Sequence, residues 1–147
     1  MPIKTFRGQI PIGVQEKINL STNDGLTGYR IKKFQILSST PGVGDLEYIA
    51  QIYSTNKSSN VNTEPDFSNP NLLAVIYYQD DARPLYPESQ SVIFDNEVIN
   101  QDIFVNVTDA GGATTPCNFY IELEQIKLDL NESTYTTLKN IRSRTQA

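Results

Sequence analysis

Residues 117–124 read Cys117-Asn118-Phe119-Tyr120-Ile121-Glu122-Leu123-Glu124, and apolar side chains alternate with more polar ones along the stretch. A period of two is typical of a β-strand that places one face on a core and the other in water. The same alternation recurs in residues 9–20, at Ile10, Ile12, Val14, Ile18 and Leu20. Strands with one buried and one solvated face are characteristic of antiparallel sheets. The two segments therefore predict an antiparallel β-protein.

Two breaks in the alternation predict β-bulges. In residues 29–37 the apolar positions change parity at Lys32-Lys33, and in residues 119–128 they change parity at Glu124-Gln125. One extra residue in a strand returns the apolar side chains to a common face and bends the strand. We therefore expect a bulge at each position, as in strands that curve around a closed core.

Further strands are expected at residues 46–53, 72–78, 92–94 and 103–107. Residues 72–78 are apolar throughout, which favours a central strand covered on both faces. About seven or eight short strands separated by turn residues are typical of a Greek-key sandwich. We therefore expect an all-β fold, with a single antiparallel β-sandwich or jelly-roll-like domain over residues 1–130.

The end of the chain, residues 131–147, predicts a short C-terminal helical arm. Asn131 is of a residue type that caps helices, and Tyr135, Leu138 and Ile141 recur at helical spacing. The threonine-rich interior gives this segment a low intrinsic helix propensity. We therefore expect the helix to form by docking against other structure.

Positive charge gathers in the last turns of the arm, at Lys139, Arg142 and Arg144. One interpretation is a helix end whose charges suit the helix dipole. The other is an arm that lies on an acidic patch of a neighbouring subunit, for example a second copy of this acidic chain. These three residues are candidate partner contacts under the second interpretation.

Two connections are unusually long, residues 54–70 and residues 80–90. Long loops in compact domains are commonly functional. The second contains Arg83-Pro84 and Tyr86-Pro87, and residues before proline favour extended backbone. We therefore expect a stiff projecting loop, with Arg83 and Tyr86 as candidate partner contacts, because Arg and Tyr are enriched at interface anchors.

Tyrosines near this loop allow an alternative function, stacking on a sugar. Tyr77 and Tyr78 end the predicted central strand, and Tyr86 lies in the loop. The simpler interpretation is that rings at the rim of a sandwich pack inward and leave their hydroxyls in water.

Composition argues against several classes of function. The chain has 147 residues, a net charge of −5 and no histidine. DNA- and RNA-binding domains normally carry an excess of Lys and Arg, so we expect no nucleic-acid partner. No apolar run approaches the length of a membrane span, so we expect no membrane partner.

The reactive residue types do not form a recognisable active site. Cys117 has no histidine to activate it and is expected to be a small buried hydrophobe. Asp95, Glu97 and Asp102 form an oxygen-rich stretch that could hold calcium, but it lacks the EF-hand spacing and is better explained as a solvated turn. We therefore expect no enzymatic activity and predict no catalytic residue, cofactor or metal ligand.

Several short segments form a pattern that spans most of the chain. They are Arg7-Gly8-Gln9-Ile10, Gly28-Tyr29-Arg30-Ile31, Pro41-Gly42-Val43-Gly44 with Glu47-Tyr48-Ile49, and Leu73-Ala74-Val75-Ile76-Tyr77-Tyr78-Gln79-Asp80, followed by residues 94–95, 100–103, 116–124 and 138–142. In this pattern the chain resembles small, acidic β-sandwich virion structural proteins of marine tailed bacteriophages. None of these segments is a functional signature, so no site residue is carried over. The resemblance implies a virion location, with assembly in the host cytoplasm.

The expected function is that of a capsid cement or decoration protein that bridges neighbouring capsid subunits. Its partners would be the major capsid protein or other virion proteins, together with further copies of itself as a homo-oligomer. The alternative is a carbohydrate-binding module or a component of the tail, neck or fibre base. A hydrolase with unrecognised carboxylates is a third reading.

Overall fold

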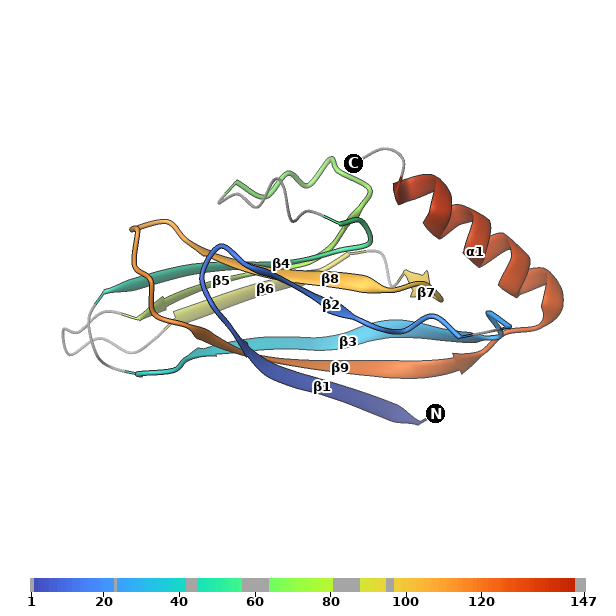
Figure 1. Cartoon of the computed structure of the whole chain (residues 1–147), viewed down its shortest axis with the longest axis horizontal. Coiled ribbons are helices and arrows are strands. Elements are labelled where there is room, and N and C mark those ends of the chain that lie inside the picture. The colour runs from blue at the N-terminus through green and yellow to red at the C-terminus, as the bar shows by residue number, and fades with distance from the viewer. Residues whose placement is uncertain are drawn as a thin grey trace.

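The structure is a computed structural model that describes residues 2–22, 24–41, 45–56, 64–80, 88–94 and 97–144, with the backbone alone at 88, 89 and 142–144. These residues form strands and one helix (Figure 1). In chain order the elements are β1 (Ile3–Ile10), β2 (Gln15–Ile18), β3 (Thr27–Ser38), β4 (Leu46–Tyr53), β5 (Leu72–Asp80), β6 (Glu88–Ile93), β7 (Val98–Ile99), β8 (Ile103–Asp109), β9 (Cys117–Lys127) and α1 (Leu130–Arg144).

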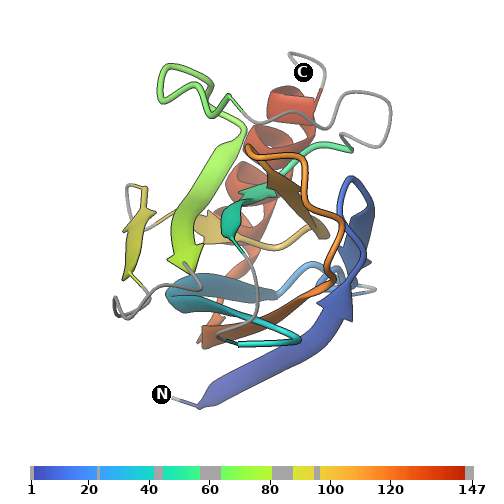
Figure 2. The same cartoon turned by 90° about the vertical axis from the view of Figure 1, so that its left-hand side faces the viewer.

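The strands form two antiparallel sheets that face one another, as the end-on view in Figure 2 shows. One sheet has the order β1-β9-β3-β7 and the other has the order β2-β8-β4-β5-β6. The first strand thus pairs with the last, the second with the eighth and the third with the seventh. Nested pairing of this kind is the wrapping of a jelly roll. The predicted all-β, jelly-roll-like sandwich is confirmed.

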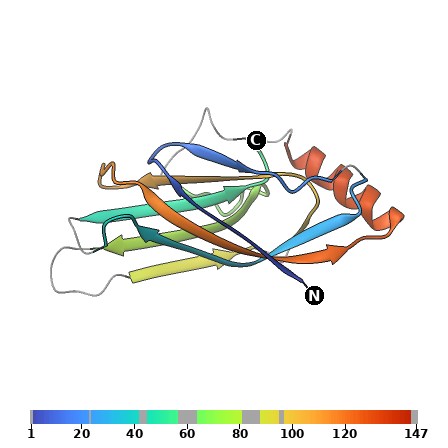
Figure 3. The ribbon, with the colours of Figure 1, turned by 60° about the horizontal axis from the view of Figure 1, so that its bottom comes forward.

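The chain changes sheets at Pro11, where a single strand over residues 9–20 was predicted. That prediction is wrong, because β1 ends at Ile10 and β2 begins at Gln15 in the opposite sheet. Proline has no N–H to continue a ladder. Gly13 turns the chain with a φ of 81° and donates its N–H to Val107 O at 2.8 Å. Figure 3 shows the resulting turn between the two blue strands.

One of the two predicted bulges is present. The register between β3 and β9 shifts between Ile31 and Lys33, as expected. The bulge predicted at Glu124-Gln125 is wrong, since these residues pair with Arg30 and Tyr29 without a shift. The parity change there has another cause. Ile126 is only half-buried, and Leu128 becomes buried after β9 has ended at Lys127.

The core lies between the sheets and includes the stacked rings of Tyr48 and Tyr78, whose centroids are 5.9 Å apart. Over β4 and β8 the outer face of the five-stranded sheet is also buried, at Gln51, Phe104 and Asn106 among others. Figure 1 shows the green connection between β4 and β5 above this face. Residues 72–76 of β5 are buried on both faces, as expected of a central strand.

Candidate functional site

The helix α1 packs across one end of the sandwich (Figure 1). Asp129 caps it: its Oδ1 accepts the N–H of Glu132 at 2.7 Å, and its carbonyl accepts the N–H of Ser133 at 2.8 Å. Asn131, the predicted cap, is instead the second residue of the helix. The N–H of Glu132 also lowers the pKa of the Asp129 carboxyl, because it stabilises the charged form.

A group of polar residues, the docking cluster, holds α1 on the sandwich. It consists of Gly25, Asn100, Ser133, Thr137 and Asn140. The side-chain amide of Asn100 donates to Thr137 Oγ1 at 2.6 Å and to Gly25 O at 3.1 Å. The backbone N–H of Asn100 donates to Asn140 Oδ1 at 3.2 Å, and Ser133 Oγ donates to Gly25 O at 2.8 Å. Because Asn100 is buried, its hydrogen bonds fix both the position and the rotation of the helix.

Gly25 is required at this contact for two reasons. Its φ of 66° lies in the left-handed region, which side chains with a Cβ rarely adopt. A Cβ at this position would also lie only 3.0 Å from Ser133 Oγ. The turn that precedes β3 thus forms a close-fitting support for the helix.

The rest of the α1 surface is exposed and carries four large apolar side chains, with the exposed polar residues Asn131 and Thr134 among them. Leu130, Tyr135, Leu138 and Ile141 are 75%, 70%, 56% and 46% exposed, and we call them the α1 outer face. Surface helices normally bury their apolar side and expose their polar side. Here the arrangement is inverted, because the docking cluster covers the polar side. Adjoining exposed apolar side chains commonly mark an interaction site.

The sequence-predicted contact residues are placed as follows. Lys139 forms an ion pair with Glu97 of the same chain, which ties the helix to the segment before β7. Arg142 and Arg144 lie in the last turn of α1, and their side chains are outside the described residues. Arg83 and Tyr86 also lie outside the described residues. Among the described residues, the α1 outer face is therefore a candidate interaction surface.

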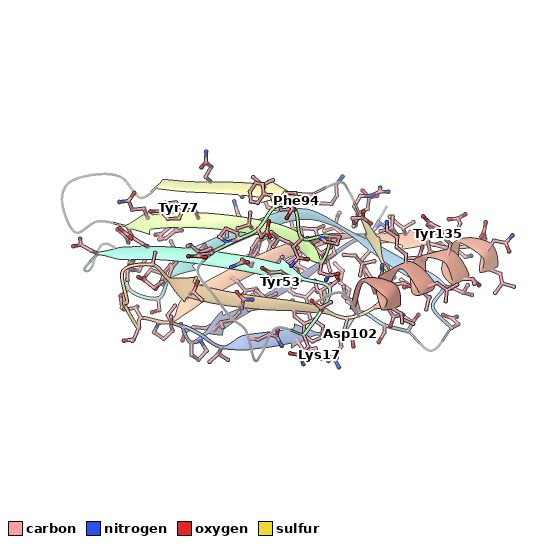
Figure 4. The ribbon with its side chains drawn as sticks, turned by 90° about the horizontal axis from the view of Figure 1, so that it is seen from above. Lys17, Tyr53, Tyr77, Phe94, Asp102 and Tyr135 are labelled. Atoms are coloured by element: carbon pink, nitrogen blue, oxygen red, sulfur yellow. The ribbon has the colours of Figure 1, made fainter. Side chains whose placement is uncertain are left out.

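The acidic residues of the oxygen-rich stretch, Glu97 and Asp102 among them, make separate structural contacts. Asp102 Oδ1 accepts the N–H groups of Leu20 at 2.8 Å and Ser21 at 2.9 Å, and its Oδ2 lies 3.2 Å from Lys17 Nζ (Figure 4). Glu97 pairs instead with the helix. Asp95 lies outside the described residues. Within the part of the chain that the structure describes, no three His, Cys, Asp or Glu residues are grouped so that they could hold a metal ion.

These contacts make the stability of the protein depend on the charge of Asp102. Burial alone would raise its pKa, but donation from Ser21, Leu20 and Lys17 brings the pKa below its ordinary value. A lowered pKa means that the ionised form stabilises the fold above the unfolded-state pKa of about 3.9 and that this contribution is lost as the pH falls through the folded-state pKa.

We therefore expect Asp102→Asn to destabilise the protein at pH 7 and to cost progressively less as the pH falls below about 4. Urea unfolding at a series of pH values measures the difference between the variant and the parent. Asp45→Asn, at an exposed position, is the control and should change stability little. A difference in stability between variant and parent that stays constant down to the lowest pH would contradict the stabilising role of the ionised Asp102 carboxylate.

Cys117 is fully buried, as predicted. Desolvation raises the pKa of its thiol to about 12. Because only the thiolate attacks a disulfide reagent, we expect native Cys117 to be unreactive towards such reagents at pH 8 and to react promptly in denaturing urea. Absorbance of the released thiol measures this. Rapid reaction of the native protein would show that the region around β9 opens readily.

The aromatic residues proposed for sugar stacking are not equivalent. Tyr78 is buried in the core against Tyr48, so its ring is not available to a ligand. Tyr77 is 39% exposed on the opposite face of β5. Tyr86 lies outside the described residues. The ring of Tyr78 therefore packs inward, as the simpler interpretation expects, but its hydroxyl is buried as well and does not lie in water.

No known protein-family model matches the chain, and no curated protein matches its sequence. In the residues that the structure describes, no helix is both long and apolar enough to cross a membrane. The fold and the exposed helix face therefore define the class: a jelly-roll-like β-sandwich that presents a docked C-terminal helix.

Proposed function

We propose that this chain is a non-enzymatic virion structural protein, a capsid cement or decoration protein that bridges neighbouring capsid subunits. The observation that carries the proposal is the α1 outer face, whose four large side chains remain exposed on a helix that is fixed in position. A helix fixed in this way loses little conformational entropy when a partner covers it. The exposed face therefore suits an assembly contact.

The physical mechanism is mass action. A protein that binds the assembled shell, and not the free subunits, shifts the equilibrium towards the shell. The sandwich provides a rigid body, and α1 lies at one end of it (Figure 1). Many copies repeated over a symmetric shell would each add a small contribution. Virion proteins, the major capsid protein among them, are the proposed partners.

The composition of purified particles tests this proposal. Quantitative mass spectrometry should find the chain in particles, on the order of hundreds of copies per head for a protein that follows shell symmetry. Antibody labelling seen by electron microscopy should place it on the head. A handful of copies at one vertex would instead favour the neck, tail or fibre base, and absence from particles would refute a virion role.

A second test addresses bridging itself. Particles that lack the protein should disassemble at a lower temperature, and addition of purified protein should restore their stability. Leu138→Glu protein should restore it less well, because a charge in the apolar contact is costly to bury. Leu37→Glu, at an exposed leucine of β3, is the matched control. Equal rescue by both variants would exclude α1 as the bridging surface.

One observation favours a carbohydrate-binding role as a second candidate. Phe67 is 60% exposed and forms an edge contact with Phe94, with ring centroids 4.7 Å apart. Exposed aromatic rings can stack on sugars. Binding of the protein to a glycan array that is lost in Phe67→Ala or Tyr77→Ala would support this role. If the protein binds no glycan on the array, a carbohydrate-binding role is refuted.

A further inference from the structure

We propose that the α1 outer face pairs with the same face of a second copy of this chain, with the two helices antiparallel. This inference names one partner of the surface invoked above. It rests on the proposed function in one respect, since a virion brings many copies close together. Two features of α1 favour another copy as the occupant, and a third keeps the outer face exposed in the monomer.

The first feature is the spacing of the side chains. Tyr135, Leu138 and Ile141 follow one another at intervals of three, and Leu138 lies next to the midpoint of Leu130–Arg144. If two antiparallel helices cross at Leu138, the two Leu138 side chains meet. Tyr135 of each copy then lies at the same level along the helix axis as Ile141 of the other, on the two flanks of the Leu138 contact. An apolar contact centred on Leu138 is therefore compatible with a two-fold symmetric dimer.

The second feature is the distribution of charge along the helix. The first turn and its cap carry Asp129 and Glu132, whereas the last turns carry Arg142 and Arg144. An antiparallel pair places the acidic end of each helix beside the basic end of the other and aligns the helix dipoles favourably. A parallel pair would place like charges together. Charge thus favours both a second copy and one orientation of it.

The third feature is the rigid support of the helix. Asn100 and Ser133 hold its polar side on the sandwich, so the helix does not need to rotate or fold in order to dock. The same contacts prevent α1 from turning its apolar side inward. In an isolated monomer the outer face therefore stays in water, and pairing removes it from water.

The size of the contact sets its strength. A helix of 15 residues is about 22 Å long, and one such helix pair buries less than the roughly 1,000 Å² expected of a stable independent interface. We therefore expect a weak dimer that depends on protein concentration. On a particle, closely spaced copies would raise the effective concentration and strengthen the pairing.

Sedimentation velocity of the full chain tests the association. The parent protein should change from monomer to dimer as its concentration rises, and Leu138→Glu should remain monomeric at the highest concentration. Leu37→Glu adds the same charge to an exposed leucine outside α1 and should dimerise like the parent. Circular dichroism and the unreactive Cys117 confirm that both variants fold. A parent that stays monomeric, or a Leu138→Glu variant that still dimerises, would overturn the proposal.

Oxidative crosslinking tests the orientation. In the antiparallel pair, cysteines in Leu138→Cys meet across the two-fold axis, within the Cα separation of about 7 Å that a disulfide allows. Those in Leu130→Cys lie about 24 Å apart along the axis and should not crosslink. Efficient crosslinking of both variants would indicate a parallel pair and reject the antiparallel model.

The two proposals can fail separately. If the parent dimerises and Leu138→Glu is monomeric, but the chain is absent from particles, the pairing is supported and the virion function is refuted. If the chain is abundant on heads but neither associates nor crosslinks through Leu138, the function stands and the outer face belongs to a different virion protein.

Discussion

Replacing Ile121 with alanine is expected to lower the free energy of unfolding by about 2–5 kcal/mol, the range for truncating a buried aliphatic side chain to alanine. Ile121 has no exposed surface and lies on β9, the strand between β1 and β3. It stands opposite Phe6 on one neighbour and Phe34 on the other. Loss of its side chain leaves a cavity that paired strands on both sides prevent from closing. Urea unfolding followed by circular dichroism measures the loss.

The control for this prediction is Leu37→Ala, on β3, because its side chain is 49% exposed. Truncation there removes few packing contacts and should cost less than about 1 kcal/mol. If Ile121→Ala cost as little as Leu37→Ala, the two sheets could not be packed against one another at this position.

The second large effect is expected for Asn100→Ala. The variant loses the donors to Gly25 O and Thr137 Oγ1 at a partly buried contact, where Gly25 O keeps only the hydroxyl of Ser133. Loss of two such bonds should cost about 2–3 kcal/mol. The effect should be local, because the lost bonds join α1 and the turn before β3 to Asn100. Hydrogen exchange should therefore show that the α1 amides lose protection while those of β9 keep it.

Asn131→Ala provides a matched comparison, since it removes the same side chain from an exposed position on α1. It should leave both the free energy of unfolding and the exchange of the helix nearly unchanged. Full protection of α1 in Asn100→Ala would mean that some other contact holds the helix.

The strands were predictable where their pattern depends on one buried face. Alternation around Ile121 marks β9, and the parity change at Lys32-Lys33 marks a true bulge. The same reasoning failed at Glu124-Gln125, because a parity change also arises where a strand approaches its end and a later residue packs independently. It failed at Pro11 because a sequence pattern continues across a turn that carries the chain into the other sheet.

The helix was predictable, but the side by which it docks was not. Periodic Tyr135, Leu138 and Ile141 indicate an amphipathic helix, and burial of that apolar side is the usual outcome. The decisive contacts come from Asn100 and Gly25, which are 75 residues apart in the chain and are brought together only by the fold. The one local signal was the equally regular spacing of Ser133, Thr136, Thr137 and Asn140, all small or polar residues that become buried or half-buried.

The pairing of the first strand with the last has a consequence for synthesis of the protein. Ile3 lies opposite Glu124, and β3 also takes its partner from the same late segment. The four-stranded sheet therefore cannot form on the ribosome until β9 has emerged. Until then β1 and β3 lack β9, the strand that pairs with both of them. Contacts between residues so distant in sequence also form slowly. The chain should therefore depend on chaperones during translation more than a helical protein of equal length.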